Sequence, residues 1–326
     1  MITRRAGLVW ALAATAGIGG AARAGNNRAV TLMVGAPMGS SADRAARAFV
    51  DCLAGHLPMM TLSVSNRPGE AGWTMLTDLS RAPADGSIIG WVSTPNLVAR
   101  MIDRNDPELM QRIQLVGQVE REPVAFVSPA SNPVDSVQDI IRRAADDADA
   151  APLATPPAGS PPHLTVLRLQ ALAQTRLNIV TFPSAAAAAQ AALAGNVSAA
   201  ALGLSDVIDA IRDGGLSAIG IAARKRFGLL PDTPVLNEAG IPLSAFIGRG
   251  LAVPAGTPVD IVAKLGDGLR AVVADEAFQD QIRPSGYHLL WKDGTVWRAD
   301  AEAERAMLGK LWATDPWLQS STGGAG

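Results

Sequence analysis

The sequence has a single cysteine, Cys52, and only three histidines in 326 residues. One cysteine cannot form an intramolecular disulfide. His56, His163 and His288 have no metal-ligand spacing with one another or with Cys52. The G-x-G-x-x-G, Walker and G-x-S-x-G motifs are also absent. These absences argue against a cofactor, a metal and a catalytic nucleophile. We therefore expect a binding protein rather than an enzyme, with Cys52 as a buried structural thiol.

The chain also lacks a basic cluster. Lys and Arg together number 28, and Asp and Glu number 30. Such a mildly acidic chain argues against nucleic acid and anionic membrane surfaces as partners. Any bound anion must then be attracted by local dipoles rather than by net charge. Beyond the N-terminal leader, no run reaches the roughly 18 uncharged apolar residues that a transmembrane helix needs.

The N-terminus has the pattern of a secretory signal peptide. Arg4 and Arg5 give a basic start, residues 6–20 are apolar and uncharged, and Ala22-Arg23-Ala24 gives a cleavage pattern. We predict a signal peptide at 1–24 and a mature protein in the periplasm. No lipobox cysteine follows the leader, so no lipid anchor is expected.

Short apolar runs alternate with helical patterns along the rest of the chain. This alternation is typical of βαβ units and predicts an α/β fold with mostly parallel sheets flanked by helices. Strands are expected at 29–35, 61–65, 87–92, 113–119, 123–128, 177–182, 198–204, 216–222 and 249–253. Helices are expected near 41–56, 135–148, 161–174, 185–194 and 206–213. The C-terminal part, at 258–278 and 295–313, has a purely helical pattern.

The length of the chain favours two domains. We interpret the strand runs 113–128 and 249–254 as crossings between them. This predicts a discontinuous domain 1 at 25–122 plus 249–326, and a domain 2 at 123–248. Such an arrangement is typical of a hinged clamshell, in which the ligand enters the cleft between the domains.

Two segments share one plan, in which an apolar strand leads through a Gly/Ser turn directly into a helix. They are VTLMVGAPMGSSADRAAR at 30–47 and LATPPAGSPPHLTVLRL at 153–169. Each turn leaves unpaired backbone N–H groups at a helix start, where the helix dipole favours an anion. The two turns together predict two half-sites that close on one acidic small molecule.

In the first turn, Ser40-x-x-Asp43 fits a capping box. Gly39 allows a ligand to approach the backbone closely, and Ser41 adds a hydroxyl. An isolated S-x-x-D pattern is most often only a helix cap. The anion-binding interpretation is favoured because no Lys, Arg or bulky side chain covers the segment 38–42.

In the second turn, Ser160 is the expected N-cap before Pro161-Pro162, because proline suits the first helical position. His163 follows in the first turn of the helix, where the dipole disfavours imidazolium. A neutral His163 either braces the loop or hydrogen-bonds a ligand, and bracing is the preferred interpretation.

These turns and several shorter blocks, in this order and spacing, resemble the substrate-binding proteins of tripartite tricarboxylate transporters, the Bug-type periplasmic receptors. The segment 38–47 is similar to that family's P-G-G-x-x-D-x-x-A-R, and 159–164 is similar to its G-S-x-x-H-L. The other matching blocks are Asn66-Arg67-Pro68-Gly69-Glu70-Ala71-Gly72, Pro83-Ala84-Asp85-Gly86, Leu230-Pro231-Asp232-Thr233-Pro234, Glu238-Ala239-Gly240 and Pro254-Ala255-Gly256-Thr257-Pro258.

The resemblance implies a two-domain periplasmic-binding-protein fold of the Venus-flytrap type. It also implies a ligand carboxylate held by backbone amides, hydroxyls and waters from both turns. We expect a monomer that binds a small carboxylate, either an organic acid or an acidic amino acid, and delivers it to membrane permease subunits. The expected ligand-binding residues are Met38, Gly39, Ser40, Ser41, Ser93, Thr94, Asn96, Ala158, Gly159, Ser160, His163, Phe182, Ser205 and Asp206.

Three departures from the family pattern fall at this expected site. Met38 and Ser40 replace the usual Pro and second Gly, and Trp73 replaces a smaller or polar residue. The family block V-P-Y-[KR]-G becomes Val180-Thr181-Phe182-Pro183-Ser184, which loses the phenol hydroxyl. These changes favour a ligand that is less polar than a tricarboxylate in the distal part of the pocket.

Two alternative functions stay open at this point. The same receptor can present its closed form to a membrane sensor kinase instead of a permease. An exported enzyme can also use a doubly wound scaffold, although the sequence offers no evident nucleophile–base pair.

Overall fold

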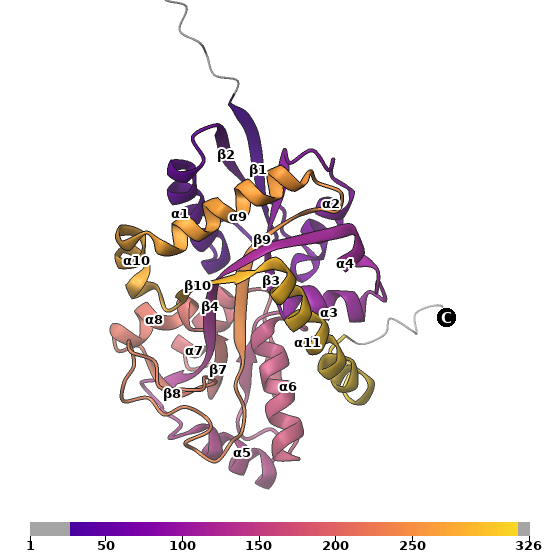
Figure 1. The fold of residues 1–326 in the computed structure, drawn as a ribbon. Coiled ribbons are helices and arrows are strands. Elements are labelled where there is room, and N and C mark those ends of the chain that lie inside the picture. Colours follow the sequence, from indigo (N-terminus) through magenta and orange to yellow (C-terminus); the bar gives the residue numbers. More distant parts are fainter. Residues whose placement is uncertain (1–26, 319–326) are drawn as a thin grey trace, which may run out of the picture.

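The computed structural model describes residues 27–318, which fold into two lobes joined by a long shared strand (Figure 1). The predicted signal peptide at 1–24 lies outside the described residues. Within residues 27–318, no helix has the length and apolar character needed to cross a membrane.

The N-terminal part contains the three predicted strands and the predicted helix at 41–56, together with further helices that were not predicted. Its elements are β1 (Arg28–Val34), α1 (Ser41–His56), β2 (Met60–Asn66), the short 3-10 helix η1 (Glu70–Gly72), α2 (Trp73–Arg81), β3 (Ile88–Thr94), α3 (Asn96–Asp103) and α4 (Leu109–Arg112). Helix α1 forms because Ala45, Phe49 and Leu53 recur at helical spacing and are buried on one face.

The middle of the chain forms the second lobe. Its elements are β4 (Ile113–Pro129), α5 (Val137–Asp146), β5 (Leu153–Thr155), α6 (Pro161–Ala173), β6 (Ile179–Thr181), α7 (Ala185–Leu193), β7 (Ala199–Gly203), α8 (Leu204–Arg212) and β8 (Leu216–Ile221).

The chain then returns to the first lobe. The returning elements are β9 (Phe246–Pro254), α9 (Val259–Ala274), α10 (Glu276–Ile282), the 3-10 helix η2 (Arg283–Ser285), β10 (His288–Asp293) and α11 (Gly294–Thr314). Helices α9 and α11 fall at the predicted helical stretches 258–278 and 295–313, but β10 lies between these stretches and was not predicted. Four consecutive half-buried residues in this strand give no period-two alternation, and its partner β4 is remote in sequence.

The α/β class is confirmed, but the two sheets are mixed rather than mostly parallel. In the first lobe, β1 lies parallel to β2 and β3, whereas β3–β9, β9–β4 and β4–β10 are antiparallel. In the second lobe, β5 lies parallel to β6 and β7, whereas β4 is antiparallel to β7 and β8. A chain that leaves one lobe along β4 and returns along β9 must run in opposite directions, which makes these neighbours antiparallel.

Strand β4 is one 17-residue element, although the sequence predicts two runs at 113–119 and 123–128. The charged residues Glu120, Arg121 and Glu122 interrupt the apolar pattern between those runs. In the structure both glutamates are completely buried inside the continuous strand. The predicted domain limits at 122/123 and 248/249 fall within β4 and β9, and these limits remain a prediction.

Each sheet has a hydrophobic core on both of its faces. In the first lobe, Phe49 and Leu265 belong to one core, and Leu97 and Trp297 belong to the other. In the second lobe, one core includes Phe126 and Val166, and the other is rich in alanine and includes Ile208. Helices α1 and α9 cover one face of the first sheet, and α3 and α11 cover the opposite face (Figure 1).

Candidate functional site

The first turn leads from β1 into α1 with the capping geometry that the sequence predicts. Ser40 is the N-cap, and its hydroxyl accepts a hydrogen bond from the Asp43 amide at 3.3 Å. The Asp43 carboxylate accepts in return from the Gly39 amide at 2.8 Å. Gly39 has a φ of 80°, a left-handed conformation that glycine adopts without strain.

Asp43 is buried and fully occupied within this turn. Its carboxylate also accepts hydrogen bonds from Arg47 Nε at 3.0 Å and from Asn66 Nδ2 at 2.9 Å. Burial acts to raise the pKa of Asp43, but Arg47, the Gly39 amide and Asn66 together hold that pKa below its ordinary value. Asp43 therefore stabilises the turn as an anion, and the Ser41 and Ala42 amides of α1 remain available to a ligand.

A pocket opens where β1 and β3 end, and three helices begin around it. We call it the first-lobe pocket. Ala42 from α1, Gly72 just before α2 and Asn96 from α3 each line it near a helix N-terminus. The full lining consists of Val34, Gly35, Ala36, Ala42, Gly72, Met75, Leu76, Trp91, Ser93, Asn96 and Arg249. The carboxyl ends of parallel strands are the usual ligand-binding edge of an α/β sheet.

The polar groups of the first-lobe pocket favour an anion. Its lining includes no Asp or Glu, whereas Arg249 brings a guanidinium and Ser93 brings a hydroxyl. The indole N–H of Trp91 is buried and has no hydrogen-bond partner among the described residues. Positive helix ends and hydrogen-bond donors thus meet in one place.

A cluster of buried charges lies beside this pocket. Arg249 Nη1 donates hydrogen bonds to Glu120 and, at 2.7 Å, to Glu122. These residues are not among the predicted site residues, because the 113–128 and 249–254 runs carry only a strand pattern. The available signal was the charged segment 120–122 within an apolar run, since buried charges in proteins are normally paired.

Glu122 also connects the two lobes. Its Oε1 accepts hydrogen bonds from the backbone N–H and from the hydroxyl of Ser205, both at 2.6 Å. Next to it, burial and the Glu122 charge raise the pKa of Asp206 to about 6, although a hydrogen bond with Ser41 opposes this rise. Ser41 and Ser205 line a neighbouring pocket together with Arg44. The structure thus brings three predicted residues, Ser41, Ser205 and Asp206, together across the lobes.

The second turn is braced in a different way. The Gly159 amide donates to His163 Nδ1 at 3.3 Å, and Arg100 Nη2 donates to the Ala158 carbonyl at 3.1 Å. Burial and the nearby Arg100 charge lower the pKa of His163 to about 4, so the imidazole is neutral at pH 7. The Ser160 hydroxyl is buried, makes no cap bond and has no partner among the described residues.

The second turn does not line the first-lobe pocket, but it contacts α3, whose first residue lines that pocket. Arg100 contacts the second turn and stands one helical turn after Asn96, which lines the pocket. Other predicted residues lie elsewhere. Met38 is exposed, Thr94 accepts a hydrogen bond from Trp297 beneath α11, and Phe182 packs half-buried against the alanine-rich core of the second lobe.

Cys52 is half-buried rather than buried, near the opposite end of α1 from the pocket. Burial and Asp275 raise the pKa of its thiol to about 11, so Cys52 is not a thiolate nucleophile at pH 7. Within the described part of the chain, the only group that could hold a metal is Cys52, His56 and Asp275, whose ligand atoms lie within 4.8 Å of one another. The sequence analysis missed it because Asp275 comes from a distant segment.

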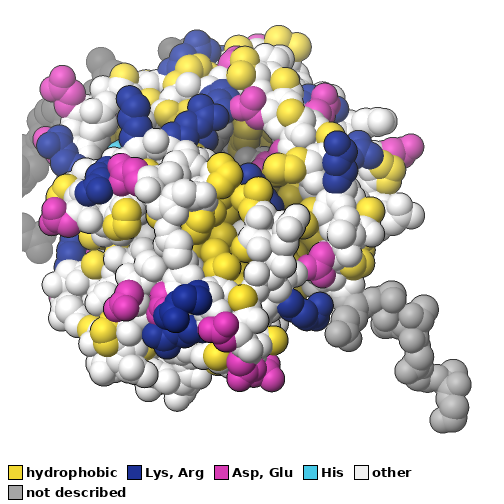
Figure 2. Space-filling model, turned by 90° about the horizontal axis from the view of Figure 1, so that it is seen from below, with side chains coloured by type: hydrophobic (Ala, Val, Ile, Leu, Met, Phe, Trp, Pro, Cys, Tyr) yellow, Lys and Arg dark blue, Asp and Glu magenta, His cyan; other side chains and the backbone are white. Residues whose placement is uncertain are grey.

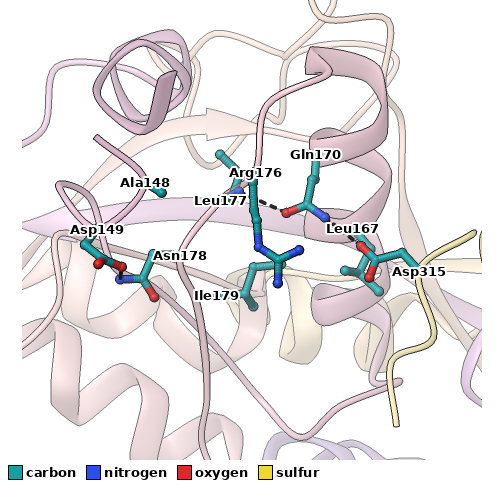
Figure 3. Close-up of a pocket in the computed structure, with 9 residues that line it drawn as sticks. All are labelled: Ala148, Asp149, Leu167, Gln170, Arg176, Leu177, Asn178, Ile179 and Asp315. Atoms are coloured by element: carbon teal, nitrogen blue, oxygen red, sulfur yellow. Dashed lines mark hydrogen bonds between the residues drawn. The ribbon is translucent and has the colours of Figure 1, made fainter. Parts of the chain in front are cut away.

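A further hollow lies between α6, the segment before β6 and the segment after α11 (Figure 3). Gln170 on α6 donates to Asp315 at 2.6 Å and accepts from the Leu177 amide at 2.9 Å. Arg176 extends into the hollow (Figure 3). No sequence-predicted site residue lines it, and the Gln170 contacts connect the second lobe to the C-terminal segment.

Figure 2 shows how charged and hydrophobic side chains are distributed over one face of the molecule. Basic and acidic side chains are interspersed on this face, and hydrophobic side chains lie in the hollow near its centre (Figure 2). This face has no continuous basic patch of the kind that nucleic acid requires.

Two lobes joined by crossing strands, with a donor-lined pocket at the strand ends, define a protein of the two-domain solute-binding class. The sequence matches the family described as "Tripartite tricarboxylate transporter family receptor" over residues 45–295, and the chain belongs to this family.

Known relatives agree with this assignment. Protein BugT of Bordetella pertussis is 25% identical over 292 residues, which cover 86% of this chain and 89% of BugT. MatC of Rhodopseudomonas palustris, solved with bound malate, has a TM-score of 0.77 at 23% identity and covers 87% of this chain and 98% of its own. The R. palustris protein Rpa4515, solved with adipate, has a TM-score of 0.79 at 24% identity and covers 88% of this chain and 97% of its own. These structures share the fold of this chain.

Proposed function

We propose that this protein is a periplasmic receptor that captures a small carboxylate between its two lobes for a tripartite tricarboxylate-type transporter. The observation that carries the proposal is the first-lobe pocket, where three helix N-termini, the Trp91 N–H, the Ser93 hydroxyl and Arg249 converge without any lining carboxylate. Such a pocket attracts an anion even though the chain as a whole is slightly acidic.

Membership of the family supports the receptor role. The shared fold adds support, because one solved neighbour holds malate and another holds adipate. Gly39, Ser40, Ser41, Ser93 and Asn96 would contact the ligand from the first lobe, whereas Ala158, Gly159 and Ser160 would contact it from the second. The unpartnered Ser160 hydroxyl at the start of α6 supplies a donor on the second side.

Ligand capture would proceed by closure of the lobes about β4 and β9. We propose that domain 1 comprises 25–122 and 249–326 and that domain 2 comprises 123–248. The contacts of Ser205 with Glu122, and of Asp206 with Ser41, would then belong to the closed form. Ligand binding would shift the equilibrium between open and closed forms toward the closed form.

A thermal-shift screen of the mature chain tests this function. The panel is acetate, succinate, malate, adipate, citrate and glutamate, with glucose and succinamide as neutral controls. We expect at least one acid to raise the melting temperature in a concentration-dependent way, as mass action requires for a ligand of the folded state. Stabilisation by a neutral compound alone would refute the anion-binding function.

A further inference from the structure

Arg249 occupies an unusual position for a buried arginine. It lies on β9 between β3 and β4, is 5% exposed, and lines the first-lobe pocket. Only its Nη1 is hydrogen-bonded to the described residues, and both partners of Nη1 are glutamates. Because Nε and Nη2 also carry N–H groups, one edge of the guanidinium has donors without protein partners.

The glutamates hold the guanidinium in place from the β4 side. Glu120 is the register partner of Arg249, and Glu122 lies two residues further along the same strand. Both side chains are completely buried, and Glu122 is itself held by Ser205. A guanidinium gripped at Nη1 loses much of its rotational freedom before any ligand arrives, which lowers the entropic cost of a contact at its other edge.

The β3 side of Arg249 supplies further donors. Ser93 is the register partner of Arg249 on β3, so the two side chains are cross-strand neighbours on one face of the sheet. Trp91 lies two residues before Ser93 on the same face and carries the buried, unpartnered indole N–H. Nε and Nη2 of an arginine match a planar carboxylate as a bidentate fork, and the hydroxyl and indole extend this donor set.

We propose that Arg249 binds a ligand carboxylate through Nε and Nη2, with Ser93 and the Trp91 N–H beside it and with Glu120 and Glu122 as positioning residues. This inference rests on the proposed carboxylate-binding function. It adds a charged, bidentate contact to the dipoles of the two turns.

Substitution of Arg249 by lysine is the direct test. Arg249→Lys keeps a cation for Glu120 and Glu122 but removes the bidentate fork, so the buried cluster is not left without a positive charge. The matched control is Arg121→Lys. Arg121 lies in the same crossing region, but it stacks over Phe246 at 3.6 Å and does not line the pocket. Trp91→Phe removes the indole N–H and keeps an aromatic ring.

Calorimetric titration with succinate, malate, adipate and citrate gives the readout, after circular dichroism and melting curves show that each variant is folded. For each acid that binds the wild type, we expect Arg249→Lys to weaken binding by about tenfold or more. Trp91→Phe should weaken it by roughly threefold to tenfold, and Arg121→Lys should stay within about twofold. The monoamide of the best-binding diacid provides a further comparison. If its amide group occupies the fork, the Arg249→Lys substitution should weaken binding of the monoamide less than it weakens binding of the diacid.

The outcomes distinguish a failure of the proposed receptor function from a failure of the proposed role of Arg249. If no panel acid binds the wild type, the proposed function fails and this assignment fails with it. If the acids bind the wild type and folded Arg249→Lys binds them within twofold, the receptor function stands and the role of Arg249 is refuted. An equal loss of affinity in Arg121→Lys would also refute it, because the loss would then reflect general changes in the crossing region.

Discussion

The two turns follow the same backbone plan but are held by opposite chemistry. The first turn is built around a buried anion, Asp43, which binds the Gly39 amide, Arg47 and Asn66. The second turn is built around a neutral imidazole, His163, and a buried cation, Arg100, whose pair with Asp103 spans 2.5 Å. The supports of the two turns should therefore respond differently to mutation and to pH.

Removal of the cation that supports the second turn should have the largest effect. In Arg100→Met, the fully buried Asp103 side chain loses its closest cation and keeps only the Trp317 indole N–H at 2.8 Å and the more distant Arg104, and burial already raises the pKa of Asp103. We expect a loss of about 3–5 kcal/mol in the free energy of unfolding, measured by urea denaturation. Arg142→Met is the control, because Arg142 is 70% exposed in its pair with Asp139 and its loss should change the free energy of unfolding far less than Arg100→Met does. Similar losses in the two variants would contradict the role of Arg100.

Low pH should also destabilise the second turn, because it protonates the His163 imidazole. The pKa of His163 in the fold is about 4, below its ordinary value of 6.5, so the folded state resists protonation. Stability from this group is fully present above about pH 6.5 and is lost as the pH falls toward 4, by about 3 kcal/mol at most. His163→Asn keeps an acceptor for the Gly159 amide but cannot titrate.

The measurement is the difference in unfolding free energy between wild type and His163→Asn at pH 7.5 and at pH 4. We expect this difference to shift by up to about 3 kcal/mol in favour of the variant at pH 4. A difference that stays constant between the two pH values would show that His163 is not a buried neutral support.

Neutralisation of the anion in the first turn should have a smaller effect. Asp43→Asn keeps one acceptor but loses the charge that Arg47 and the Gly39 amide contact, so we expect a cost of about 2 kcal/mol in urea denaturation. The matched control is Asp139→Asn on α5. Asp139 belongs to the same S-x-x-D pattern, after the N-cap Ser136, and lies outside the first-lobe pocket. Both variants should lose stability, and only Asp43→Asn should weaken carboxylate binding.

The smallest expected difference compares the two N-cap serines. Ser40 makes a cap bond and Ser160 makes none. Ser40→Ala should therefore cost about 1 kcal/mol in melting experiments. Ser160→Ala should change stability by less than about 0.5 kcal/mol but weaken ligand binding. If Ser160→Ala lost as much stability as Ser40→Ala, this would contradict the observation that the Ser160 hydroxyl makes no cap bond.

Local patterns predicted much of the fold. The alternation of apolar runs and helical faces gave the α/β class, and S-x-x-D gave the Ser40–Asp43 cap that the structure contains. The strand at 288–293 was missed because it is stabilised by pairing with β4, about 170 residues earlier in the chain. Glu120 and Glu122 led the prediction to divide β4, because charges rarely stand inside a buried strand unless a partner neutralises them.

For the candidate site, the sequence identified both turns, together with Ser93 and Asn96, which line the pocket. It did not identify Arg249 or Trp91, because an arginine in a strand and a tryptophan in a core give no sequence pattern for a ligand. Their importance comes from register, which aligns Arg249 with Ser93 on one side and Glu120 on the other.

The sequence by itself thus determined the class of fold, the family and the two helix starts, because propensity, capping and periodicity act over a few neighbouring residues. Only the tertiary structure decided how the turns are braced and which donors face the pocket. The donors of the pocket depend on strand register and on the pairing of buried charges, which bring Arg249 together with residues more than a hundred positions away.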